Sequence, residues 1–251
     1  MTGPRTGPGG RGRLARRQAA LLRLTTQIAA AHAEAEIYQS VVNGLRDPAI
    51  GFDFVGVFLL DAATGDRVMQ ACVGWSDLPD GFRLPRDKGL SARPFEDGAL
   101  HYTADVTKVP GYVPGLESGS EVDVPLRIDD EIAGVLVVES QEPNAFGPAD
   151  LEILTAAANQ AASAVGRARL VERQQSLLAA ERRQKQYFED LVLNNPIAIV
   201  TLDPDHTVVS CNPAFEQLYG YRQAEVAGRN LDELITTEET RAQATAYTRR
   251  V

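Results

Sequence analysis

Cysteine is scarce in this sequence, which has two cysteines among 251 residues. Cys72 and Cys211 lie far apart and outside any Cys-x-x-Cys spacing. The sequence therefore encodes neither a disulfide framework nor a zinc site, and this cysteine usage predicts a cytoplasmic protein. We interpret both cysteines as small buried apolar residues.

Long apolar runs and an excess of basic charge are also missing. No window approaches the roughly 18 consecutive apolar residues that span a bilayer, so we expect no membrane segment. The formal net charge is -9 at pH 7, which argues against nucleic acid or an anionic membrane as the main partner. Residues 1–13 are a local exception, rich in Arg, Gly and Pro without the apolar run of a signal peptide, and we expect a disordered basic lead-in.

Acid–base pairs that could serve catalysis are lacking as well. His32, His101 and His206 each stand without a partner in the pattern, so we assign no catalytic residue and no metal site.

A helix is predicted over residues 14–46, because apolar residues recur there with a spacing of seven in two rows. Two interpretations stay open: one amphipathic helix packed on its own domain, or a helix that pairs with a second copy of the chain. In the second interpretation, the contact residues are Leu14, Leu21, Leu24, Ile28, Ala35 and Val42.

Residues 47–148 change to short runs of strand length, which predict an α+β domain around a six-stranded antiparallel sheet flanked by long helices. Asp129-Asp130 forms a short acidic turn between the last two strands, and residues 90–97 are a short helix candidate. The strands are expected at 54–61, 67–74, 81–85, 99–105, 121–128 and 131–140.

A second helix is predicted over residues 149–193, with Pro148 at its first position and Asp150 near its positive end. Its heptad frame shifts after Ala168, which is a stutter in coiled-coil terms. We expect a connecting coiled coil in a parallel homodimer. Its predicted contacts are Leu151, Leu154, Val165, Leu170, Leu177, Phe188 and Leu191.

The stretch NNPIAIVTLDPDHTVVSCNPAFEQLYGY (194–221) predicts two strands about a turn and then a helix capped by Asn212 with Pro213 at its first position. Together with AEVAGRNLDELI (224–235), it resembles the N-terminal half of a PAS domain, assigned to residues 187–251. The resemblance implies that the remaining strands follow Val251.

The stretch SEVDVPLRIDDEIAGVLVVESQEPNAFGPADLEIL (120–154) resembles a GAF domain. A GAF domain joined by a helical linker to a PAS domain implies the input region of a bacterial signalling protein, most often a sensor histidine kinase. Diguanylate and adenylate cyclases are built similarly, and a ligand-free GAF scaffold is a further alternative.

GAF domains commonly hold a small molecule on the open face of the sheet, and polar residues that interrupt apolar strands are the candidates for such a pocket. A buried carboxylate is costly unless a cation, a water or a donor meets it. The alternative is that these acids face solvent or pair with Arg127 and Lys108. The candidate pocket residues are Trp75, Tyr102, Tyr112, Glu121, Asp123 and Glu139.

One enzymatic GAF subgroup, the free methionine sulfoxide reductases, is similar at Ser120-Glu121 and at residues 134–140. Those enzymes need a reactive cysteine and a second one to resolve it. This domain has Cys72 alone, and Val137 stands where the subgroup usually has an acid, so we expect no such catalysis. The sequence also lacks the attachment and ligand motifs that would support bilin, flavin or haem.

Overall fold

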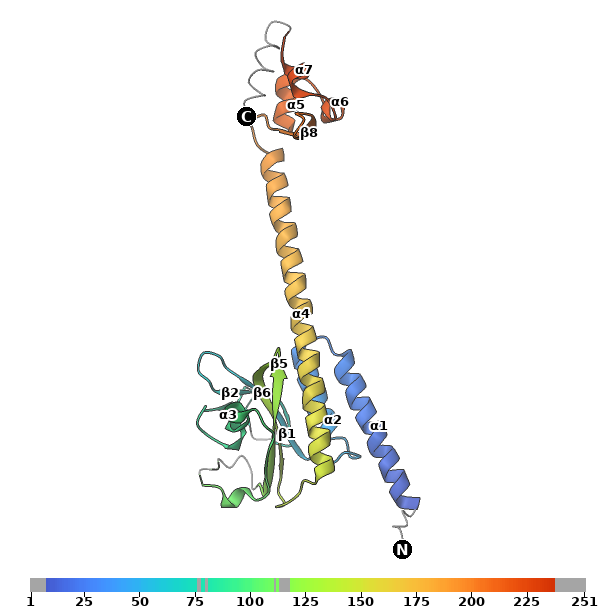
Figure 1. Ribbon diagram of the computed structural model, residues 1–251, viewed down its shortest axis with the longest axis vertical. Helices are drawn as coiled ribbons and strands as arrows, with labels where there is room; N and C mark the ends of the chain where they lie inside the picture. The colour runs from blue at the N-terminus through green and yellow to red at the C-terminus, as the bar shows by residue number, and fades with distance from the viewer. Residues whose placement is uncertain (1–7, 76–77, 80, 111, 113–117, 238–251) are drawn as a thin grey trace. The chain divides into compact units, whose positions relative to one another are not determined.

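The computed structural model describes residues 8–75, 78–79, 81–110, 112 and 118–237. The chain divides into two compact units, Met1–Glu172 and Arg173–Val251. Figure 1 shows the elements of both, with helix α4 beginning in the first unit and ending in the second.

Two helices, α1 (Pro8–Ala30) and α2 (Glu34–Leu45), replace the single helix that the heptad pattern predicts over 14–46. The break is stabilised by the carboxylate of Glu36, whose Oε2 accepts hydrogen bonds from the backbone N–H of His32 at 3.2 Å and of Ala33 at 3.4 Å. The expected disordered lead-in is wrong for residues 8–13, because α1 already begins at Pro8, where a missing N–H costs nothing. Residues 1–7 lie outside the described part.

The first unit contains the predicted six-stranded sheet, and the predicted α+β class is confirmed. All paired strands are antiparallel, and their order across the sheet is β3-β2-β1-β6-β5-β4. Asp129 and Asp130 join β5 to β6 with positive φ angles of 51° and 66°, as a two-residue type I′ hairpin turn requires. The strands are β1 (Phe54–Leu60), β2 (Arg67–Val73), β3 (Arg83–Leu84), β4 (His101–Thr103), β5 (Ser120–Ile128) and β6 (Glu131–Ser140).

Helices cover one face of this sheet (Figure 1). The N-terminal part of α4 (Pro148–Leu193) packs there with α2 on the inner strand residues. Val124 and Leu136 from the sheet, Val41 from α2, and Ala158 and Val165 from α4 belong to one buried cluster. Each fully buried aliphatic side chain of this kind contributes about 1.5–3 kcal/mol, so this layer holds the unit together.

Short helices and loops cover the other face. A 3₁₀ turn at Leu90–Ala92, helix α3 (Pro94–Asp97) and a 3₁₀ turn at Val106–Lys108 lie in these connections. A small second cluster, with Phe58, Met69, Val135 and Val137, forms on this face. Binding residues are often carried by loops that a rigid sheet supports, so this face is where a binding site is expected.

In its described residues, the second unit has a two-stranded antiparallel sheet and three short helices around a core that includes Val208, Phe215 and Val226. The predicted cap is confirmed: Asn212 Oδ1 accepts the backbone N–H of Phe215 at 3.0 Å, with Pro213 at the start of the helix. The elements are β7 (Val200–Leu202), β8 (Val208–Cys211), α5 (Pro213–Tyr219), α6 (Gln223–Val226) and α7 (Leu231–Ile235).

No helix in the described part of the chain combines the length and the apolar character that crossing a bilayer requires.

Candidate functional site

A cavity of about 230 Å³ lies on the sheet face opposite α2 and α4. Strand residues Phe58, Glu121, Val137 and Glu139 form one side of it. The edge strand β3 and the connecting segments supply the rest, with Trp75, Leu78, Phe82, Leu84, Gly89, Leu90, Ser91 and Tyr112. The volume suits a small metabolite, and the lining combines apolar walls with a few polar groups, as ligand pockets do.

Two glutamates face each other inside this cavity. Glu121 on β5 and Glu139 on β6 are partners in the antiparallel register, so their side chains share one face of the sheet. Asp123, two residues along β5, lies on that same face because side chains alternate with a period of two. Glu121 is 3% exposed and Asp123 is fully buried. Three carboxyl groups are thus packed together away from water.

The three acids differ in their hydrogen-bond partners. Glu139 accepts a bond from the Ser118 hydroxyl and another from the Trp75 indole. Among the residues that the structure describes, no N–H or O–H donor reaches either oxygen of Asp123. The carboxyl of Glu121 can donate to Asp123 when it is protonated. The pair therefore needs a shared proton, or a cation from outside, to be stable.

Burial raises the pKa of all three acids, because it removes water from the charged form. Repulsion from Asp123 and Glu139 raises the pKa of Glu121 further. Burial raises the pKa of Asp123 to about 7. Burial raises the pKa of Glu139 too, and the bonds from Ser118 and Trp75 partly offset that rise. The three acids consequently bind protons well above the pH at which an exposed carboxyl releases them.

Arg67 belongs to the surroundings of this site and was not predicted from the sequence. It is 1% exposed, and its guanidinium donates to Ser91 Oγ at 2.6 Å, to the Pro85 carbonyl at 2.8 Å and to the Lys88 carbonyl. Burial lowers its pKa, while the charges of Asp123 and Glu121 oppose that effect. Arg67 therefore holds the segment over the cavity in place. Its signal in the sequence was strand alternation, which puts it on the same face as Met69.

Five of the six predicted pocket residues meet at this site, and one does not. Trp75, Tyr112, Glu121 and Glu139 line the cavity, with Asp123 buried beside Glu121.

Tyr102 is the exception, and its placement in the pocket was wrong. It pairs with Val122 in the register of β4 with β5, so its ring points to the helix-covered face and packs edge-on against Phe146 at a centroid distance of 5.9 Å.

The alternative in which the acids pair with surface cations is wrong. Arg127 donates to the Gly98 carbonyl at 2.9 Å, and Lys108 pairs with Asp105 at 2.8 Å. Both cations are thus engaged elsewhere, so the burial of the three acids has to be balanced by Arg67, by protons or by a ligand.

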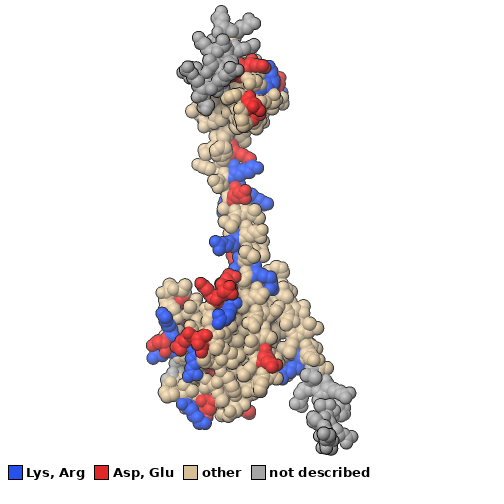
Figure 2. Space-filling model, viewed as in Figure 1, with Lys and Arg blue, Asp and Glu red and all other residues tan. Residues whose placement is uncertain are grey.

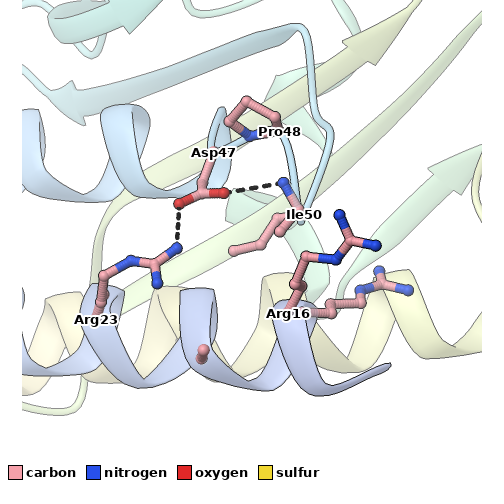
Figure 3. Close-up of a pocket in the computed structure, with 8 residues that line it drawn as sticks. Arg16, Arg23, Asp47, Pro48 and Ile50 are labelled. Atoms are coloured by element: carbon pink, nitrogen blue, oxygen red, sulfur yellow. Dashed lines mark hydrogen bonds and ion pairs between the residues drawn. The ribbon is translucent and has the colours of Figure 1, made fainter. Parts of the chain in front are cut away.

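A second hollow, open and about 750 Å³ in volume, lies between α1 and the segment that follows α2. Arg16 and Arg23 project into it from α1 (Figure 3). Arg23 pairs with Asp47 at 2.7 Å, and Arg17 pairs with Asp150 at the start of α4. These pairs neutralise most of the local charge, so we interpret this surface as a contact that holds α1 against α4 and the end of α2, and not as a ligand site.

The residues predicted for a contact between two copies fall into two groups. Those of the first unit pack inside it: Leu24, Ile28, Val42, Leu154 and Val165 are buried, and Leu21 and Leu151 pack against the same core. These positions are corrected to core positions, because a side chain covered by its own domain cannot reach a partner. Ala35 is exposed on α2, and the side chain of Leu14 lies outside the described residues.

The second group lies on the C-terminal part of α4 and is exposed. Figure 2 shows uncharged side chains between the Lys, Arg, Asp and Glu of this part. The predicted residues Leu170, Leu177, Phe188 and Leu191 are exposed, and so are their neighbours Val171, Leu178, Tyr187 and Leu193. An apolar stripe this long on a helix is typical of a surface that binds another protein.

Cys72 lies on β2, partly buried, and packs against the cluster of Phe58 and Met69. Cys211 is buried in the second unit, and burial raises the pKa of its thiol. Across the described residues, no group of three or more His, Cys, Asp or Glu is arranged to hold a metal ion.

Comparison with known families assigns both units. The GAF domain family matches residues 31–166, and the PAS domain family matches residues 195–250. The chain belongs to the GAF domain family. Its GAF domain, a long helix and a PAS region follow one another, as the two sequence resemblances implied.

One relative of the GAF domain is a bacterial protein. Protein YtsP of Bacillus subtilis (strain 168) is 30% identical over 133 residues, which cover 52% of this chain and 75% of YtsP.

Solved structures of other proteins share the fold, and two examples follow. The GAF domain of an Acinetobacter phosphoenolpyruvate-protein phosphotransferase matches with 23% identity and a TM-score of 0.56, covering 62% of this chain and 95% of its own. The free methionine-R-sulfoxide reductase of Neisseria meningitidis, crystallised in complex with its substrate, matches with 22% identity and a TM-score of 0.56, covering 62% of this chain and 91% of its own. At this identity the likeness shows the fold alone.

Proposed function

We propose that this chain is the sensory and dimerisation input region of a bacterial signalling protein, foremost a sensor histidine kinase, and that its GAF cavity binds a small organic cation. GAF and PAS domains together are typical of signalling proteins. A diguanylate or adenylate cyclase is the alternative output. The observation that carries the ligand proposal is the buried acid cluster of Glu121, Asp123 and Glu139, which has one buried arginine, Arg67, near it.

The charge balance of the cavity favours a cationic ligand. Three ionised carboxylates against one guanidinium leave a net charge of about -2 in a site of low effective dielectric, where unpaired charges are unfavourable by several kcal/mol. A bound ammonium group supplies the missing positive charge and a hydrogen-bond donor for Asp123, to which no described residue donates. Trp75 and Phe58 add aromatic faces to the same lining, and aromatic faces attract cations.

The size and the lining restrict the ligand further. About 230 Å³ holds a molecule of metabolite size, and Leu78, Phe82 and Leu84 present apolar surface to its tail. We therefore propose a primary amine with a short apolar side chain. The Neisseria meningitidis reductase, which has the same fold, was crystallised with its substrate, and this supports small-molecule binding as a use of the fold.

The ligand proposal is tested by thermal-shift screening of the 251-residue chain with a panel of primary amines, amino acids and matched carboxylic acids that lack the amino group. We expect stabilisation by a subset of amines and by none of the acids. The Glu121→Gln, Glu139→Gln double variant should lose that response. The Glu131→Gln variant, altered at an exposed position on β6, the strand of Glu139, should retain it. Stabilisation by anions alone, or an equal response in the double variant, would contradict the proposal.

The exposed apolar stripe of α4, Leu170 to Leu193, supports a parallel homodimer as the second part of the proposal. Two such helices side by side cover each other's leucines, and the resulting coiled coil can carry a change from the GAF domain toward the PAS region. Ligand binding shifts such a dimer between two packings only by its difference in affinity for them.

A further inference from the structure

A cluster of three side chains lies where α4 leaves the core of the GAF domain. Arg169 donates from Nε to Glu34 Oε1 at 2.7 Å and from Nη2 to Glu34 Oε2 at 3.0 Å. The Tyr38 hydroxyl donates to the same Glu34 Oε2 at 2.9 Å. We name Glu34, Tyr38 and Arg169 the exit cluster. A fork of two parallel bonds between a guanidinium and a carboxylate fixes direction as well as distance.

The pKa shifts of the exit cluster agree with this geometry. The bond from Arg169 lowers the pKa of Glu34, and the carboxylate of Glu34 raises the pKa of Arg169. Burial, followed by the charge of Glu34, raises the pKa of Tyr38. All three groups therefore keep their bonded protonation states across the physiological pH range.

Arg169 occupies the point at which α4 changes its surroundings. Val165, one turn earlier, is buried in the domain, and Ala168 packs partly against the same core. Leu170, the next residue, is exposed. The heptad frame of the sequence shifts at this same place, from the row through Val165 and Ala168 to the row through Leu170 and Leu177. A frame shift is a place where the phase of a coiled coil can change.

Two other elements of the domain converge on this point. Glu34 is the first residue of α2 and follows the break after α1. Asp129, in the β5–β6 turn, lies beside α4, because a methyl group added to Gly166 would come within 3.6 Å of its Oδ1. The β5–β6 hairpin carries Glu121 and Glu139 of the cavity at its opposite end. The cavity and the exit of α4 are thus joined by one pair of hydrogen-bonded strands.

We propose that the exit cluster is a latch that fixes the direction and phase in which α4 leaves the GAF domain, and that Arg169 is its positioning residue. This inference rests on the proposed signalling function, since it names the element through which α4 is controlled. A movement of the β5–β6 hairpin or of the α1–α2 junction breaks the Arg169–Glu34 bonds. Without these bonds, α4 can rotate about its own axis, so that its exposed leucines face another direction. Such a device is bistable because a bidentate pair is either formed or broken.

The latch is tested by measuring distances within one chain, so that the outcome does not depend on dimer formation. Two spin labels are placed at cysteines replacing Asp130 and Glu181 in a Cys72→Ser, Cys211→Ser background, and labelled protein is diluted with unlabelled protein. Pulsed electron spin resonance then gives the distribution of distances between hairpin and helix. We expect one narrow distribution that broadens at least about twofold or shifts in Arg169→Gln and in Glu34→Gln.

Arg17→Gln is the matched control, because it removes a second ion pair between α4 and the N-terminal helices, that with Asp150, without touching the exit. We expect it to leave the distribution unchanged, and Arg169→Lys, which keeps one bond, to give an intermediate width. An unchanged distribution in Arg169→Gln, or equal broadening in Arg17→Gln, would overturn the latch. Loss of ligand binding or of dimerisation in other experiments would overturn the proposed function and leave this result standing.

Discussion

Glu121 and Glu139 lie directly opposite each other on adjacent antiparallel strands, with Asp123 beside them, in the interior of the GAF domain. Like charges placed opposite in a sheet are unfavourable even at a surface. A fold that buries such a pair without a full set of donors is less stable than it could be. Functional sites commonly lower the folding stability of a protein in this way.

The stability of the ligand-free chain should fall as the pH rises. The pKa of Asp123 is about 7 in the folded protein, above the value of about 3.9 for an unfolded aspartate. Below about pH 4 both states hold the proton, and between about pH 4 and 7 the unfolded state loses it first, so the free energy of unfolding declines by about 2–4 kcal/mol. Urea unfolding at pH 5 and pH 8 measures this, and Asp123→Asn should flatten the dependence. A wild-type chain that is more stable at pH 8 would contradict the assignment.

Glu121→Gln should make the empty protein more stable while weakening ligand binding. The amide keeps the shape of a protonated carboxyl and can donate to Asp123, which removes the repulsion that raises the pKa of Glu121. We expect a rise in melting temperature of a few degrees at pH 8, corresponding to roughly 1–2 kcal/mol. Calorimetry on the variant and the parent checks this. Glu131→Gln, at the exposed start of β6, should leave the melting temperature unchanged.

Arg67→Met should loosen the segment above the cavity. The variant loses the bonds to Ser91, Pro85 and Lys88 and the positive charge that attracts Asp123, and removal of one partner from a buried polar network costs about 3–5 kcal/mol. Amide hydrogen exchange over residues 85–91 should accelerate. The control is Arg127→Met, whose guanidinium holds one carbonyl at an exposed site and whose loss should cost under about 1 kcal/mol.

Asn212→Ala should unfold the second unit at a lower denaturant concentration. Asn212 is fully buried, and its amide donates to the carbonyls of Val192, Asn195 and Ile197 while its Oδ1 accepts from two backbone groups. Removing it leaves several buried groups unpaired, at about 1–3 kcal/mol for each. Asn230→Ala removes the cap of α7 alone and should cost about 1 kcal/mol. Equal losses in the two variants would show that the buried network adds nothing beyond a cap.

The six strands were predictable because their apolar residues alternate or run continuously between turn residues. The turn between the last two strands was predictable because Asp129-Asp130 interrupts two apolar runs and aspartate tolerates the positive φ of a tight hairpin turn. The two families were predictable from residue order in 120–154 and 194–235. The pocket was predictable at Glu121 and Glu139, where acids interrupt apolar strands. Tyr102 was misplaced because β4 has three residues, too few for alternation to fix which face is inner.

The heptad rows of residues 14–46 misled for a different reason. Over four turns, a core stripe with a period of 3.6 and a coiled-coil seam with a period of 3.5 differ by less than one residue. The spacing of apolar residues such as Ile28 and Val42 does not show whether they pack against the sheet of their own chain or against a helix of a second copy. The break after Ala30 has no Gly or Pro to mark it, and it is set by the packing of α1 and α2 on one domain.

The exposed leucines of α4 provide the sharpest test of association between copies. Leu177 on α4 is 64% exposed and Leu22 on α1 is 68% exposed, so neither contributes to the core and Asp at either position leaves the fold intact. If two α4 helices pair through the stripe, Leu177→Asp places two charges in the contact and should weaken the dimer at least about tenfold. Leu22→Asp, off the stripe, should leave it unchanged. Sedimentation equilibrium from one to one hundred micromolar, in the wild type and both variants, measures the dissociation constants. A wild type that stays monomeric over this range, or equal constants for the two variants, would remove the homodimer from the proposed function.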